Sequence, residues 1–129
     1  MSIKSSIEMV NEAKLKIKNL SIKEAITFYR NKSCVFIDLR DIRELEKNGK
    51  IKNSIHVPRG MLEFWIDPKS IYHKDYFSQN KMFLFYCASG WRSALSVLTI
   101  NKMGFQNALN LEDGFNGWLE AKGPIEKLK

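Results

Sequence analysis

Short uncharged runs and helix-periodic stretches alternate along the chain. Residues 82–86 (MFLFY) carry no charge, and residues 34–39 begin with the apolar run CVFI. Runs of this kind are typical of strands buried on both faces of a parallel sheet. Residues 5–16 have a loose helical spacing of apolar positions, and a capping box of Ser21 and Glu24 begins a helix that continues to about residue 30. Strands that alternate with helices predict an α/β fold with a mainly parallel sheet.

Shorter elements fill the rest of the chain. Residues 61–80 are a long irregular region whose aromatic side chains we expect to pack as a satellite cluster or to wall one side of a pocket. We further expect an edge strand within residues 17–20, a charged helix at 41–48 closed by Gly49, a strand within 51–57, a turn at 58–60, a helix from residue 93 to about 103, a last strand at 107–111 and a closing helix at 115–121.

Length and composition indicate one ordinary domain. The chain has 129 residues, and its 44% hydrophobic and 27% charged content is usual for a globular protein. We divide it into a helical extension at residues 1–19, packed on the domain, and a single domain at residues 20–129. The sequence contains no apolar run of membrane-spanning length and no signal-peptide core, and its two cysteines form no paired motif. A cytoplasmic location is therefore expected.

The formal net charge of +7 leaves three interpretations. Nucleic-acid binding is disfavoured because the lysines are spread along the chain and no basic helix or aromatic–basic module is present. The charge could instead steer a small anionic substrate. The interpretation that we favour is a lysine-rich solvated surface. We expect neither nucleic acid nor a membrane as a partner.

The stretch KMFLFYCASGWR, residues 81–92, has the strongest chemical signal. Cys87 directly follows the uncharged run, and a helix-periodic segment begins soon after it. The cysteine is thus expected at the carboxyl end of a strand, where open α/β sheets bind ligands. The helix start and the charge of Arg92 favour the thiolate, which is the nucleophile. Ser89 and Gly90 are small, so the loop can curl into an anion-binding nest.

Four motifs resemble those of the rhodanese family. CVFIDLRD and GKIKNSIHVPRG resemble its two N-terminal signatures, and YCASGWRSAL and MGFQNALNLEDGFNGWLEAKGPIE resemble its C-terminal half. They follow the family's order and cover about residues 20–126. The resemblance implies a rhodanese-like three-layer α/β/α fold with a mainly parallel sheet of about five strands, formed by a single rhodanese domain at residues 20–129.

The resemblance also implies a sulfurtransferase. Cys87 is then the catalytic residue, whose thiolate takes a sulfane sulfur from an anionic donor such as thiosulfate as a persulfide. Cyanide or a thiol then accepts that sulfur, and a sulfur-relay protein is left open as a further partner. The protein is expected as a monomer or homodimer, without a cofactor. The implied substrate-binding residues are Ala88, Ser89, Gly90, Trp91 and Arg92, and the supporting residues are Asp38, Arg40 and Arg59.

Some positions depart from the family pattern. Lys50 replaces a histidine, and Lys52 and Asn53 replace a proline and a glycine. Asn tolerates the left-handed conformation, so the turn can survive. Asp113 replaces a glycine and is expected to be a solvated turn residue rather than a carboxylate near the pocket. Ala88 stands where some thiosulfate-using members have a basic residue, which weakens the case for thiosulfate but not for sulfur transfer.

The remaining candidates have structural interpretations. His56 lies within an expected strand and His73 in a polar loop, and no set of three or four matched ligands forms a metal site. Cys34 opens a strand at the end opposite Cys87 and is expected in the core.

Two other functions are left open. Cysteine phosphatases and arsenate reductases also use a Cys…Arg loop, but with five intervening residues, whereas four separate Cys87 from Arg92. A smaller nest suits a single sulfur better than a tetrahedral phosphoryl group. A rhodanese-like partner-binding module often lacks the cysteine, so the presence of both residues argues against that function.

Overall fold

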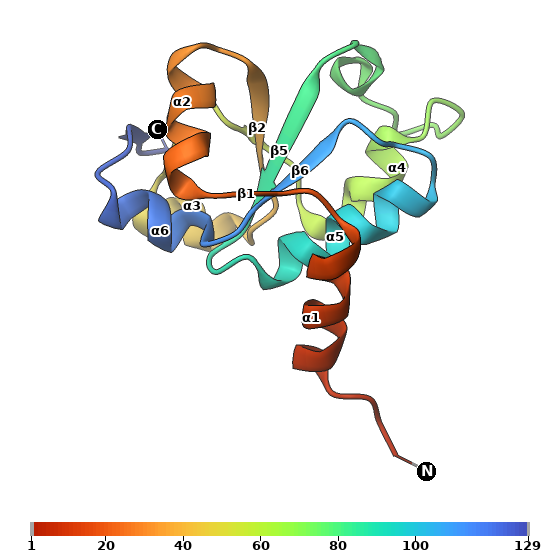
Figure 1. The fold of residues 1–129 in the computed structure, drawn as a ribbon. Helices are drawn as coiled ribbons and strands as arrows, with labels where there is room; N and C mark the ends of the chain where they lie inside the picture. Colours follow the sequence, from red (N-terminus) through yellow and green to blue (C-terminus); the bar gives the residue numbers. More distant parts are fainter. Residues whose placement is uncertain (1, 129) are drawn as a thin grey trace.

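A five-stranded parallel sheet forms the centre of the computed structural model, which describes residues 2–128 (Figure 1). Each neighbouring pair of its strands is parallel, so the five carboxyl ends lie at one edge. The expected fold with about five parallel strands is confirmed. The order is β1 (Asn19–Leu20), β6 (Ala108–Leu111), β5 (Met82–Tyr86), β2 (Cys34–Asp38) and β4 (Ile55–His56).

Helices on both faces of the sheet complete three layers. The helices α2 (Ile22–Arg30) and α6 (Gly114–Glu120) cover one face, and α4 (Leu62–Ile66) and α5 (Trp91–Lys102) cover the other (Figure 1). Among residues 2–128, no helix is both long and apolar enough to cross a bilayer.

The uncharged run of β5 is explained by these two layers. Phe83 and Phe85 pack in the core cluster under α4 and α5, whereas Leu84 and Tyr86 pack in the cluster under α2 and α6. Side chains of a strand point alternately to the two faces, so a strand covered on both sides needs apolar residues throughout. The apolar pattern therefore predicts the central position of β5 correctly.

Local capping fixes where the helices begin. The Ser21 hydroxyl accepts the Glu24 N–H, and the Glu24 carboxylate accepts the Ser21 N–H, which confirms the expected capping box of α2. A second box formed by Asp41 and Glu44 begins α3 (Ile42–Asn48). Gly49 ends α3 with a φ of 78°, as the sequence predicts.

The helix α1 (Ser6–Lys16) extends below the sheet and packs against α5 (Figure 1). Val10 and Ala13 are buried against Ala94 of α5, whereas Leu15 is exposed. The division of the chain at residue 19 stays a prediction.

Two expectations need correction. Residues 107–111 are not the last strand, because β7 (Ile125–Glu126) pairs antiparallel with β3 (Lys50–Ile51) in a small second sheet. The strand expected within 51–57 is present as β4, and Asn53, with a left-handed φ of 71°, turns the chain between β3 and β4. The region 61–80 is less irregular than expected: it contains α4 and a 3-10 turn at Asp75–Ser78, and its Phe77 packs in the main core rather than in a satellite cluster.

Candidate active site

The loop that bears Cys87 lies at the carboxyl edge of the sheet. Asp38 of β2 pairs in register with Tyr86 of β5, and the Leu39 N–H donates to the Tyr86 carbonyl at 2.9 Å. The ends of the two central strands are therefore adjacent. The helix α5 begins at Trp91, two residues earlier than predicted, so Trp91 and Arg92 belong to its first turn.

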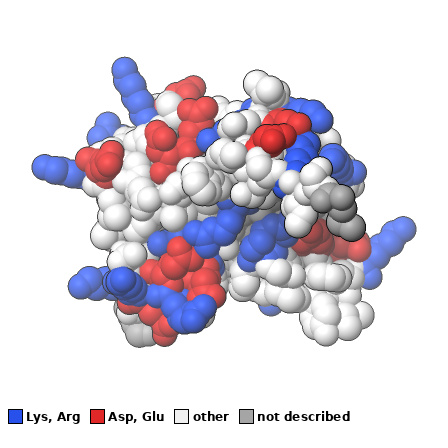
Figure 2. All heavy atoms as spheres, turned by 90° about the horizontal axis from the view of Figure 1, so that it is seen from below, with Lys and Arg blue, Asp and Glu red and all other residues white. Residues whose placement is uncertain are grey.

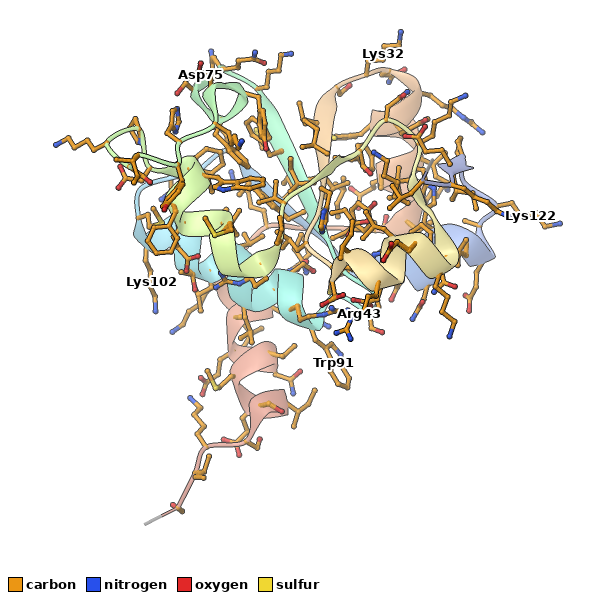
Figure 3. All side chains as sticks on the ribbon, turned by 180° about the vertical axis from the view of Figure 1, so that it is seen from behind. Lys32, Arg43, Asp75, Trp91, Lys102 and Lys122 are labelled. Carbon is orange, nitrogen blue, oxygen red and sulfur yellow. The ribbon has the colours of Figure 1, made fainter. Side chains whose placement is uncertain are left out.

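Basic side chains lie across the middle of this edge of the molecule. Figure 2 views the molecule from this side and shows Lys and Arg side chains across the centre of the face, with Asp and Glu side chains beside them. Trp91 projects from the lower surface away from the domain (Figure 3), and 56% of it is exposed.

Two glycines let the loop approach α6 and the turn before it closely. Gly90 has a φ of 87°, and a Cβ there would lie 2.1 Å from the Glu112 carbonyl oxygen. Gly114 has a φ of 57°, and its Cβ would lie 2.6 Å from the carbonyl oxygen of Cys87. No side chain fits at either position, because both the backbone conformation and the space exclude it.

The start of α6 orients the loop peptides. The Phe115 N–H donates to the Cys87 carbonyl at 2.8 Å, and the Asn116 N–H donates to the Ala88 carbonyl at 3.0 Å. Because a trans peptide holds C=O and N–H on opposite sides, the N–H groups that follow these carbonyls point away from α6. The turn before α6 thus packs on the loop, and Asp113 in that turn is exposed.

The Cys87 sulfur is recessed at the start of α5. Only 1% of Cys87 is exposed. The Ser93 N–H donates to its Sγ over 3.4 Å, and the Ser93 Oγ lies 3.5 Å from the same sulfur. Ser93 was not among the residues expected at the site. Its signal in the sequence is its place directly after Arg92, in the first turn of a helix whose N–H groups lack intrahelical partners.

Arg92 forms an ion pair with α3. Its guanidinium donates to both carboxylate oxygens of Glu44, at 2.8 and 3.0 Å. The hydrogen bonds from Arg92 lower the pKa of Glu44. The bonds to Glu44 raise the pKa of Arg92, and the nearby Cys87 contributes in the same direction. Arg92 thus pairs with Glu44 and not with Asp38, and no sequence pattern indicated Glu44.

Asp38 pairs with Arg40 instead, in a buried brace. The Arg40 Nη2 lies 2.7 Å from an Asp38 carboxylate oxygen, and both side chains are almost fully buried. The same nitrogen donates to the Gly49 carbonyl at 2.7 Å, and the guanidinium carbon lies 4.1 Å from the centre of the Phe115 ring. Arg40 thereby ties β2 and α3 to the residue whose N–H holds the Cys87 carbonyl.

The other sequence candidates have different partners. Arg59 forms an ion pair with Glu63, 2.8 Å away and one helical turn further on. His56 Nε2 lies 2.7 Å from the Arg40 carbonyl oxygen, and His73 Nε2 lies 2.9 Å from the Ser78 hydroxyl. Within residues 2–128, no three His, Cys, Asp or Glu side chains are grouped so that they could hold a metal ion.

A cavity of about 870 Å³ lies away from Cys87, near the amino end of β2. Its lining includes Tyr29, Phe36 and the half-buried Cys34. Burial raises the pKa of the Cys34 thiol to about 12, so this sulfur is held in its unreactive form. The cavity therefore does not compete with the Cys87 loop as the place of thiol chemistry.

A model of the rhodanese-like domain matches residues 6–121 of the chain. The chain belongs to the rhodanese-like domain family. Across this rhodanese-like chain, 115 residues are 25% identical to the mouse thiosulfate sulfurtransferase/rhodanese-like domain-containing protein 3, with 85% of this chain and 73% of that protein covered. Its relatives therefore include proteins of the sulfurtransferase class.

Two solved structures are similar over nearly the whole rhodanese-like chain. A Rhodopseudomonas palustris protein of unknown function, described as a possible tyrosine phosphatase, is 43% identical, with a TM-score of 0.93 and 98% of each chain covered. The homodimeric polysulfide-sulfur transferase of Wolinella succinogenes is 31% identical, with a TM-score of 0.70, 95% of this chain and 87% of that chain covered.

Proposed function

We propose that this rhodanese-like chain is a sulfurtransferase in which Cys87 carries the transferred sulfur. In the first half-reaction, the Cys87 thiolate attacks the outer sulfur of a donor such as thiosulfate. The S–S bond of the donor breaks, sulfite leaves with the electron pair, and Cys87 becomes a persulfide. In the second, cyanide or a thiolate attacks the outer sulfur and leaves as thiocyanate or as a new persulfide, which restores the Cys87 thiolate.

The position of the Cys87 sulfur carries this proposal. The recessed sulfur lies at the start of α5, with the Ser93 N–H directed at it and the Arg92 charge nearby. Negative charge on a thiolate or persulfide is favoured at such a helix start. Because 1% exposure leaves only a narrow approach, a donor must reach the thiol with a small terminal atom, as the outer sulfur of thiosulfate or of a polysulfide can.

Substrate roles for the other site residues follow from their places. Arg92 attracts and orients the anionic sulfur donor. Its guanidinium already binds the Glu44 carboxylate, so the sulfur donor and this carboxylate compete for the same N–H groups. Trp91 shapes the entrance, and Ala88, Ser89 and Gly90 form the loop around the outer sulfur. Asp38 and Arg40 support the loop through Phe115. Arg59, paired with Glu63, is the supporting residue with the least structural backing.

Phosphate-ester hydrolysis is the second candidate, because a structure 43% identical to this chain is described as a possible tyrosine phosphatase. A phosphatase loop must surround a tetrahedral phosphoryl group with N–H donors. Here four residues separate Cys87 from Arg92, and the sulfur is almost fully covered. Sulfur transfer therefore agrees better with the geometry.

Steady-state assays separate the two candidates. Thiocyanate formation from thiosulfate and cyanide should show ping-pong kinetics, disappear in Cys87→Ser and persist in Cys34→Ser. Hydrolysis of p-nitrophenyl phosphate should stay at background in all three proteins. Phosphate release that depends on Cys87, without transfer of sulfur from thiosulfate or polysulfide, would establish the phosphatase instead.

A further inference from the structure

A chain of hydrogen bonds, fully buried at Ser93 and Asn110, connects Cys87 with the N-terminal segment that contains Lys14 and Asn19. The Ser93 hydroxyl donates to Asn110 Oδ1 at 2.6 Å, and Asn110 Nδ2 donates to Asn19 Oδ1 at 3.0 Å. Asn19 Nδ2 in turn donates to the backbone carbonyl of Lys14 at 2.8 Å. Ser93 and Asn110 are fully buried, so their groups depend on one another for partners. The reaction described above uses neither asparagine.

The direction of every bond in this chain follows from its last acceptor. The Lys14 carbonyl can only accept, which places the amide nitrogen of Asn19 toward it and the amide oxygen toward Asn110. Asn110 must then donate to Asn19 and present its own oxygen to Ser93. The hydroxyl proton of Ser93 consequently points at Asn110 and away from the Cys87 sulfur.

This direction determines what Ser93 offers to the sulfur. With its proton committed to Asn110, the Ser93 Oγ, 3.5 Å from the sulfur, can only accept the proton of the Cys87 thiol. After ionisation the same oxygen presents lone pairs to a thiolate. To donate to the thiolate, the hydroxyl must rotate and break its 2.6 Å bond, leaving the buried Asn110 oxygen without a donor.

We propose that Asn110, fixed by Asn19, is a positioning residue that holds the Ser93 hydroxyl as an acceptor for the Cys87 thiol and so restrains the reactivity of the resting enzyme. The proposal rests on the proposed function in taking Cys87 as the nucleophile. Arg92 and the Ser93 N–H favour the thiolate, and the Asn110 chain opposes them. Asn19 and Lys14 belong to the N-terminal segment. The position of that segment therefore determines how Asn110 holds the Ser93 hydroxyl, and so how far the Cys87 thiol is restrained.

Alkylation of Cys87 by iodoacetamide tests the proposal without any sulfur donor. Asn110→Ala removes the acceptor, the Ser93 hydroxyl turns to the sulfur, and the alkylation rate near neutral pH rises roughly tenfold. Asn110→Asp keeps an oxygen facing Ser93, so its rate stays at or below that of the unchanged protein. If Asn110→Ala does not fold, Asn110→Val fills more of the space and still offers no acceptor.

The Ser93→Ala background separates positioning from packing. There the hydroxyl is absent, so adding Asn110→Ala should leave the alkylation rate unchanged, whereas loosened packing would still raise it. Asn107→Ala, an exposed substitution just before the same strand, is the matched control and should behave like the unchanged protein. Equal rate increases in Asn110→Ala and Asn110→Asp, or an undiminished effect in the Ser93→Ala background, would overturn the proposal.

The same variants keep the two proposals apart. Persulfide formation is measured by mass after addition of thiosulfate or polysulfide. A protein that shows the predicted alkylation pattern but takes up no sulfur would refute the sulfurtransferase and leave the role of Asn110 intact. Sulfur uptake with alkylation rates that do not respond to Asn110 would refute the role of Asn110 alone.

Discussion

Replacing Glu44 by Gln measures how strongly this carboxylate competes with an anionic donor for Arg92. Glu44 accepts two hydrogen bonds from the guanidinium and a third from the Asp41 N–H at 3.0 Å, which begins α3. Gln has the same shape and still accepts from Asp41, so the helix keeps its cap. The substitution removes the negative charge beside Arg92 and one of the two guanidinium hydrogen bonds, because the Gln amide nitrogen cannot accept from Arg92.

The expected gain is modest because the pair is partly solvated. The side chains of Arg92 and Glu44 are 43% and 33% exposed, and ion pairs of such exposure are worth about 0.5–1 kcal/mol. The kcat/KM for thiosulfate should therefore rise about two- to fivefold. Because Arg92 lowers the pKa of Glu44, the competition is present at neutral pH and is lost as the pH falls through that lowered pKa.

A pair of alkylating reagents isolates the electrostatic part of this effect. Iodoacetate is anionic and iodoacetamide is neutral. Dividing the iodoacetate rate at Cys87 by the iodoacetamide rate cancels changes in the thiolate that affect both reagents equally. This ratio should rise in Glu44→Gln by the same two- to fivefold factor. Glu46→Gln removes one charge from the same helix at an exposed position and is the control.

Two results would refute the reasoning. One is an unchanged ratio in Glu44→Gln, and the other is an equal rise in Glu46→Gln.

Arg92→Ala should lower kcat/KM for thiosulfate by a factor that corresponds to about 1.5–3 kcal/mol, the worth of a hydrogen bond to a charged group. In the Arg92→Ala background there is no guanidinium to compete for. Glu44→Gln can then act only by removing the electrostatic repulsion between Glu44 and the anionic donor.

Three further predictions concern the loop and its surroundings. Gly90→Ala should lower the melting temperature more than Gly104→Ala, because both positions have a positive φ but only the Gly90 Cβ meets a backbone atom, and equal losses would contradict the close packing against the turn before α6. Peptide mapping after iodoacetamide treatment at about pH 8 should find Cys87 modified and Cys34 intact, since burial raises the pKa of Cys34 to about 12, and faster labelling of Cys34 would reverse the assignment. Asp38→Ala should cost about 3–5 kcal/mol in denaturant unfolding, because it leaves the buried Arg40 without its carboxylate, and a cost near zero would show that the brace is dispensable.

The elements of this fold were predictable where the determining signal is local. The uncharged run of β5 identifies a central strand because that strand is covered on both faces. The capping box at Ser21 marks the start of α2, and Asn53 provides the left-handed turn that a glycine would usually take. Cys87 was predictable at the sheet edge for the same reason, since strand, small-residue loop and helix are contiguous in sequence.

The partners of the site residues were not predictable in this way. Glu44 lies 48 positions before Arg92, and Asn19 lies 91 positions before Asn110. Such contacts are fixed only when α3, β1 and β6 are packed around the loop, and no local pattern encodes them. The two-residue strand β7 was missed for a related reason, because its pairing with β3 gives no apolar run.

The mass of the protein after brief exposure to thiosulfate or polysulfide, followed by peptide mapping, tests the central claim most directly. The account predicts a gain of one sulfur atom on the peptide that contains Cys87, reversal of that gain by cyanide or a thiol, and no gain in Cys87→Ser. Cys34→Ser should gain the sulfur as the unchanged protein does. Sulfur located on Cys34, or no sulfur uptake by a folded protein whose Cys87 is reduced, would contradict the account.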